Sequence, residues 1–76
     1  MTRKKEIPLI VIHVGARIAS IIKAKDLRYT NVASDAGLDE QALRRYAKGK
    51  LIMGIDKLYA ISYALGVEVG DLFKSE

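Results

Sequence analysis

The stretch of residues 40–48 gathers several side chains that can form hydrogen bonds or ion pairs. These are Glu40, Gln41, Arg44, Arg45 and Lys48. In a helix their spacing places all of them on one face, and Leu43, Tyr46 and Ala47 fall on the opposite face. One face is therefore apolar, and the other carries three cations, a carboxylate and an amide. Such a face suits a negatively charged partner, and an ordinary solvated helix surface is the alternative interpretation.

The charge of the whole chain is divided unevenly. The 76 residues have a net charge of +4, but residues 1–50 hold 11 Lys/Arg against 5 Asp/Glu, whereas residues 51–76 hold 2 against 4. The polar face lies in the basic part. This asymmetry suits a polyanionic partner, and on charge alone a generic soluble basic protein is the equal alternative.

The sequence offers little for catalysis or metal binding. There is no cysteine and only one histidine, His13, so a disulfide and the usual zinc ligand sets are excluded. No nucleophile and base occur at a suggestive spacing, and there is no glycine-rich phosphate loop. We therefore expect a protein that is not an enzyme and needs no cofactor, metal or small-molecule ligand. The apolar run of residues 7–12 is too short for a signal peptide or a membrane span, so we expect a cytoplasmic location.

A helix, a tight turn and a second helix must position the polar face. The first helix is predicted over residues 29–36 and should end at Gly37, where a left-handed residue causes no strain. Leu38 should then point inward. Asp39 is expected to cap the second helix, residues 39–48, through its carboxylate.

Three further helices are predicted around this pair, over residues 8–25, 55–65 and 67–74. A strand over residues 10–12 that pairs across a dimer is the alternative for the start of the first. Residues 1–6 are expected to form a basic arm, and residues 1–76 a single all-α domain. The side chains expected in the core include Val11, Val14, Ile18, Ile21, Ile22, Leu27, Leu58, Ile61, Ser62, Leu65, Val69, Leu72 and Phe73.

The helix–turn–helix stretch resembles that of the phage repressor and Cro family, the Xre-like transcriptional regulators. The matching positions are Val32, Ala33, Gly37, Leu38 and Leu43. The resemblance extends over residues 14–73. It implies a five-helix, lambda-repressor-like DNA-binding domain that binds double-stranded DNA as a homodimer, with half-sites about one helical turn apart.

The resemblance also implies roles for individual residues. The helix at residues 39–48 would lie in the major groove, and the residues that read bases would be Glu40, Gln41, Arg44 and Arg45. A glutamine can bond adenine and an arginine guanine in a bidentate way. Glu40 can accept a hydrogen bond from cytosine or pair with Arg44 one turn later, and we favour the pairing. The residues expected at phosphates are Arg28, Tyr29, Thr30, Lys48 and Lys50.

The chain carries more apolar side chains than a single small core needs. Leu51, Ile52 and Met53 stand in a loop where the family often has polar or basic residues. They are expected at a dimer contact, with burial in the monomer as the equal alternative. The full set predicted at the dimer interface is Leu9, Ile12, Leu51, Ile52, Met53, Tyr59 and Tyr63.

The resemblance implies a transcription regulator, most simply a repressor of phage or mobile-element type that occludes a promoter. Two other functions stay open at this point. One is an antitoxin with the same fold, and the other is a helical protein-interaction module that does not bind DNA. Salt dependence separates DNA binding from apolar association, because only binding through phosphates weakens steeply as salt rises.

Overall fold

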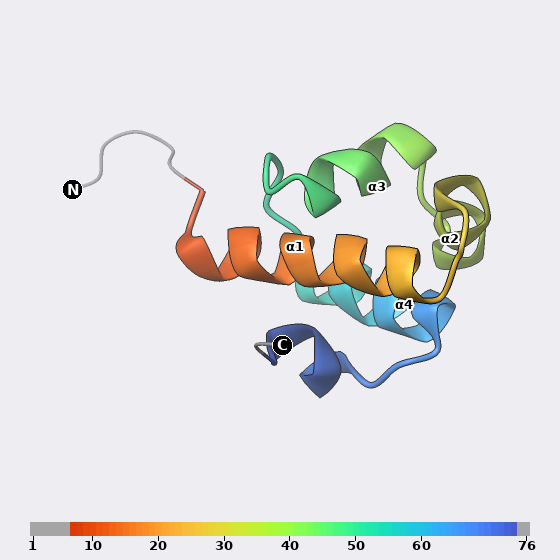
Figure 1. Cartoon of the computed structure of the whole chain (residues 1–76). Helices are drawn as coiled ribbons and strands as arrows, with labels where there is room; N and C mark the ends of the chain where they lie inside the picture. Colours follow the sequence, from red (N-terminus) through yellow and green to blue (C-terminus); the bar gives the residue numbers. More distant parts are fainter. Residues whose placement is uncertain (1–6, 75–76) are drawn as a thin grey trace.

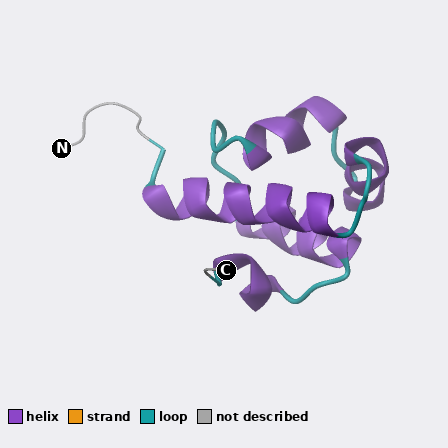
Figure 2. Cartoon of the chain, in the orientation of Figure 1, coloured by secondary structure: helices purple, strands orange, loops and turns teal. Residues whose placement is uncertain are grey.

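The computed structural model describes residues 7–74, and these form helices joined by short loops (Figures 1 and 2). The elements are α1 (Leu9–Ala24), α2 (Tyr29–Ala36), α3 (Glu40–Ala47), α4 (Ile55–Leu65) and the 3₁₀ helix η1 (Val69–Phe73). No strand occurs among the described residues, so the all-α prediction is confirmed. The alternative strand at residues 10–12 is wrong, because α1 already begins at Leu9. The predicted arm, residues 1–6, lies outside the described residues.

Proline and glycine mark several helix ends, as the sequence predicts. Pro8 is the N-cap of α1, and its carbonyl accepts the amide of Val11 at 3.0 Å. Gly37 ends α2 in a left-handed conformation with φ 72°. The amide of Leu38 then donates to the carbonyl of Ala33 at 2.8 Å, which closes the turn. The last predicted helix is a shorter 3₁₀ turn, held at its start by a capping box between Glu68 and residue Asp71.

The core draws side chains from every element. Its fully or nearly fully buried apolar residues are Val14, Ile18, Ile21, Ile22, Val32, Ala33, Leu43, Tyr46, Ile61, Leu65 and Leu72. Two residues predicted in the core are exposed instead, Leu27 by 37% and Phe73 by 45%. Leu27 lies in the turn that closes α1, not on a helix face. Phe73 ends η1 and borders a shallow apolar groove with Ile10 and Met53.

Polar contacts fasten α1 to the C-terminal elements. The Arg17 side chain donates from Nε to the Asp71 carbonyl at 2.9 Å, and Lys25 donates from Nζ to the Leu65 carbonyl at 2.9 Å. The Lys25 ammonium thereby satisfies one of the carbonyls that the end of α4 leaves without a helical partner. These bonds join the middle of α1 and its C-cap residue to segments far away in the sequence.

The packing of α1 on α3 decides how α3 is held (Figure 1). Gly15 is buried where the two helices meet, and a Cβ there would overlap the carbonyl oxygen of Tyr46. It would also lie 3.2 Å from the Ala47 carbonyl oxygen and 3.3 Å from the Gly49 nitrogen. A glycine inside a helix costs up to about 1 kcal/mol relative to alanine. Gly15 is explained by this close approach, which no other residue type permits.

We predict that Gly15→Ala lowers the free energy of unfolding by about 1–3 kcal/mol, because overpacking at a backbone contact outweighs the gain in helix propensity. Chemical denaturation followed by circular dichroism measures the change. Gly70→Ala is the matched control, since a Cβ at Gly70 would meet no atom within 4 Å. Equal stability of the two variants would contradict the account of the α1–α3 contact.

Candidate nucleic-acid interface

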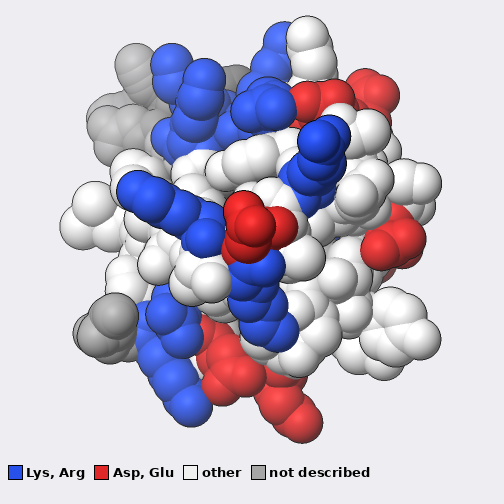
Figure 3. Space-filling model, turned by 45° about the vertical axis from the view of Figure 1, so that its right-hand side comes forward, with Lys and Arg blue, Asp and Glu red and all other residues white. Residues whose placement is uncertain are grey.

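The two faces of α3 lie as the sequence predicts. Leu43 is fully buried and Tyr46 nearly so, against the core. On the other side, Gln41, Arg44, Arg45 and Lys48 border one shallow depression. Figure 3 shows many Lys and Arg side chains on the upper part of the molecule, where α3 lies in Figure 1, and others lower on the same face, with acidic side chains among them. We call Glu40, Gln41, Arg44, Arg45 and the C-cap residue Lys48 the polar face of α3.

The turn between α2 and α3 sets the direction of this face, but one prediction about it is wrong. Asp39 occupies the N-cap position of α3, and its backbone carbonyl accepts the amide of Leu43 at 3.1 Å. Its carboxylate makes no capping hydrogen bond. Asp39 is exposed, so its side chain is solvated and the cap consists of the backbone alone.

Glu40 joins the starts of α2 and α3. Its Oε2 accepts two hydrogen bonds from Arg44, from Nη2 at 2.7 Å and from Nε at 2.9 Å. Its Oε1 accepts the hydroxyl of Thr30 at 3.1 Å. The Arg44 guanidinium lies 4.4 Å from the centre of the Tyr29 ring, within the range of a cation–π contact. The favoured pairing of Glu40 with Arg44 is therefore present in the free protein.

These contacts determine the charge of Glu40. The two hydrogen bonds from Arg44, and next the hydroxyl of Thr30, hold the pKa of the Glu40 carboxyl below its ordinary value. Hydrogen bonds of this kind favour the ionised form. Glu40 therefore stays ionised to a lower pH than a glutamate without these contacts.

The residues predicted at phosphates form two groups in the structure. Arg28 is the exposed N-cap of α2, and Tyr29 and Thr30 begin that helix. Lys48 and Lys50 follow α3 and are both exposed. Sequence reasoning placed Tyr29 and Thr30 toward DNA but missed their contacts with α3. Those contacts join residues on two helices, so local spacing carries no signal for them.

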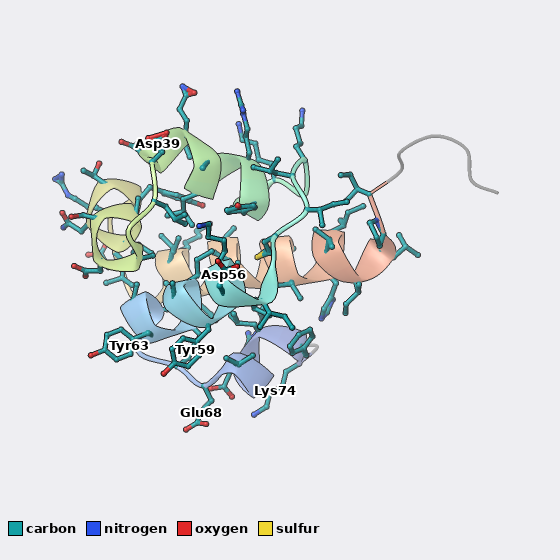
Figure 4. All side chains as sticks on the ribbon, turned by 180° about the vertical axis from the view of Figure 1, so that it is seen from behind. Asp39, Asp56, Tyr59, Tyr63, Glu68 and Lys74 are labelled. Atoms are coloured by element: carbon teal, nitrogen blue, oxygen red, sulfur yellow. The ribbon has the colours of Figure 1, made fainter. Side chains whose placement is uncertain are left out.

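The residues predicted at a dimer interface are divided between the surface and the core. Leu9, Ile12, Ile52, Tyr59 and Tyr63 are exposed, by 82%, 42%, 56%, 62% and 75%. Figure 4 shows Tyr59 and Tyr63 projecting from α4, away from Asp39 at the start of α3. Leu51 and Met53 are instead half-buried against the core of their own monomer, and one side of the exposed Ile12 borders Gly49. Packing within the monomer therefore explains in part why Leu51 and Met53 are apolar. It does not explain why Ile52 is apolar.

The described part of the chain holds no group of three or more His, Cys, Asp or Glu side chains placed to bind a metal ion. None of the helices between residues 7 and 74 is long and apolar enough to cross a membrane.

Comparisons with known proteins agree with this geometry. A family model for the Cro/C1-type HTH DNA-binding domain matches residues 17–76. No curated protein matches the chain.

Solved structures share the fold. The restriction-modification controller protein C.AhdI from Aeromonas hydrophila superposes with a TM-score of 0.81 at 23% identity, over 87% of this chain and all of that one. The clp gene regulator ClgR from Corynebacterium glutamicum gives 0.81 at 22% identity, over 88% of this chain and 71% of that one. A hypothetical transcription factor, NHTF from Neisseria, gives 0.76 at 20% identity, over 96% and 87% of the two chains.

The contacts of Glu40 predict a pH effect with a defined sign. Because the folded-state pKa is lowered, the stabilisation from this carboxylate is present above its ordinary pKa and is lost as the pH falls through the lowered value. In a carbon-detected NMR titration, Arg44→Ala should raise the pKa of Glu40 more than Thr30→Val does. The reverse order, or no change in either variant, would contradict the contacts described.

Proposed function

This chain belongs to the Cro/C1-type helix–turn–helix DNA-binding domain family, and we propose that it regulates transcription by binding a double-stranded operator with α3 in the major groove. The observation that carries the proposal is the polar face of α3, which stays exposed because Leu43 and Tyr46 anchor the opposite face in the core. The fold is shared with a restriction-modification controller protein and a clp gene regulator, which supports a regulatory role.

The polar face divides into residues suited to bases and residues suited to phosphates. Gln41, near the N-terminal end of α3, offers the amide that pairs with adenine, and Arg44 and Arg45 offer guanidinium forks for guanine. Glu40 lies among these readers. Direct readout of cytosine by Glu40 would require its carboxylate to give up bonds that it makes in the free protein.

Phosphates are proposed to bind on both sides of the base-reading residues. The first amides of α2 and the side chain of Arg28 lie at one end, and Lys48 and Lys50 follow the other end of α3. A helix N-terminus and a lysine both favour negative charge. Contacts of this kind fix the register of the protein on the duplex without reading sequence.

We also propose that the protein binds as a homodimer and represses by occluding a promoter. The exposed Tyr59 and Tyr63 lie one turn apart on α4, and both lie away from α3 (Figure 4). Aromatic side chains that share one exposed face are enriched at protein interfaces. A dimer formed there leaves both copies of α3 free to enter successive major grooves.

The first test concerns base reading. Gln41→Ala should cost about 1–3 kcal/mol of binding to the tightest duplex selected from a randomised pool, and far less on a scrambled duplex of the same length. Lys48→Ala should weaken binding to both duplexes alike, because a phosphate contact carries no sequence information. Fluorescence anisotropy at one fixed salt concentration measures all four affinities. Equal losses on both duplexes for Gln41→Ala would show that this residue does not read a base.

The second test separates DNA binding from apolar association. The affinity of the wild-type protein for the selected duplex should fall steeply as salt rises, with a logarithmic slope of about −0.9 for each phosphate neutralised. Lys48→Ala should reduce the magnitude of that slope by about 1, the contribution of one phosphate contact. A slope near zero would exclude binding through phosphates.

The third test concerns the dimer. Replacing both Tyr59 and Tyr63 by glutamate should weaken self-association by about 2 kcal/mol or more, since truncating interface aromatics typically costs this much. Sedimentation velocity measures the change. Ser20→Glu, at an exposed site on α1 outside the predicted interface, is the control. A dimer unaffected by the two substitutions would place the interface elsewhere.

A further inference from the structure

The Glu40 carboxylate is fully engaged within the protein. Oε2 receives both the Nε and the Nη2 of Arg44, and Oε1 receives the hydroxyl of Thr30. The pair is half-exposed, with 49% of the Arg44 side chain and 41% of the Glu40 side chain accessible. Exposed pairs of this type contribute little to folding stability. Stability alone is therefore a weak reason for so connected a group at the N-terminal end of the polar face.

Counting donors shows what Glu40 does to Arg44. A guanidinium carries five N–H donors in a rigid planar fork. The edge formed by Nε and Nη2 faces Glu40, so the edge that includes Nη1 remains for another acceptor. The Tyr29 ring, 4.4 Å from the guanidinium carbon, restricts the plane of the fork. Arg44 is thus held in one orientation with one bidentate edge available.

An arginine held in this way differs from one free in solvent. A free side chain loses conformational freedom when it binds, whereas a pre-organised one has already lost it. A held guanidinium also loses its bonds to Glu40 when it moves toward a nearby phosphate, and this cost disfavours the move. Both effects favour a DNA site that offers a correctly placed hydrogen-bond acceptor on a base over a DNA site that offers only the charge of its phosphates.

Resting on the proposed function, we propose that Glu40 is a positioning residue that sets DNA specificity through Arg44, and that it does not itself contact a base. Thr30 and Tyr29, at the start of α2, belong to the same network of contacts. Thr30 holds Glu40, and Tyr29 holds Arg44. The relevant quantity is the ratio of affinities for the selected and scrambled duplexes. Glu40 raises this ratio even though its charge opposes binding to both.

The test compares Glu40→Gln with Asp39→Asn. Each substitution removes one negative charge and keeps the shape of the side chain, but Asp39 makes no capping hydrogen bond and lies outside the network. Asp39→Asn should strengthen binding to both duplexes by a similar factor. Glu40→Gln should in addition lower the specificity ratio about two- to tenfold, the effect of releasing one long side chain. Glu40→Ala should lower it at least as much.

A double-mutant cycle shows whether Glu40 acts through Arg44. In an Arg44→Ala background, Glu40→Gln should leave the specificity ratio unchanged. If Glu40→Gln lowered the specificity ratio by the same factor in that background as in the wild-type protein, the proposal would be overturned. Equal effects of Glu40→Gln and Asp39→Asn on the ratio in the wild-type background would also overturn it.

An NMR measurement without DNA separates this inference from the proposed function. The Nε–H signal of Arg44 should be protected from exchange in the wild-type protein and in Asp39→Asn, and should lose that protection in Glu40→Gln. Equal exchange in all three proteins would overturn the positioning role, whatever DNA the protein binds. A wild-type protein that prefers no duplex would instead overturn the proposed function, and with it the role of Glu40 in specificity. The NMR result would in that case still report whether Glu40 holds Arg44.

Discussion

The close contact between α1 and α3 at Gly15 is the constraint on which the rest of the surface depends. The backbone of α3 approaches α1 so closely at Tyr46 that no side chain fits between them. With Leu43 fully buried on the same side, α3 cannot rotate about its axis without pulling an apolar side chain from the core. The polar face is therefore exposed as a result of packing. Helix propensity alone does not explain it, because eight residues are too few to form a stable helix in water.

A second constraint comes from the small size of the chain. Seventy-six residues without a cysteine must be stabilised by helix packing alone or by association with another chain. Arg17 near the middle of α1 and its C-cap residue Lys25 add polar contacts to this packing, yet large apolar side chains such as Ile52 and Ile55 stay exposed. This combination supports the proposed association with a second copy. Tyr59 and Tyr63 project away from the start of α3, so association through them need not cover α3 (Figure 4).

Helix limits could be predicted from the sequence because their signals are local. Gly37 and Gly66 end α2 and α4 where the sequence places them, and apolar periodicity identifies the buried faces. What could not be predicted depends on residues far apart in the chain. Gly15 weakens the helix prediction when α1 is considered alone, and its reason appears only when α3 packs on it. The prediction that Leu27 and Phe73 lie in the core was wrong. The chain has more apolar side chains than its core can bury, so apolar character alone does not identify the buried ones. For the candidate site, the polar face and the Glu40–Arg44 pair follow from spacing within one helix, whereas the contact of Glu40 with Thr30 depends on the angle between two helices.

The account centres on α3 as the element that meets DNA, and NMR mapping with a labelled protein tests this most directly. On titration with a short duplex at low salt, the largest shifts should fall on the backbone and side-chain signals of residues 40–48 and of the first turn of α2. They should fade as salt is added, because phosphate contacts dominate the affinity. Shifts confined to α4 and η1, or none at low salt, would contradict the account.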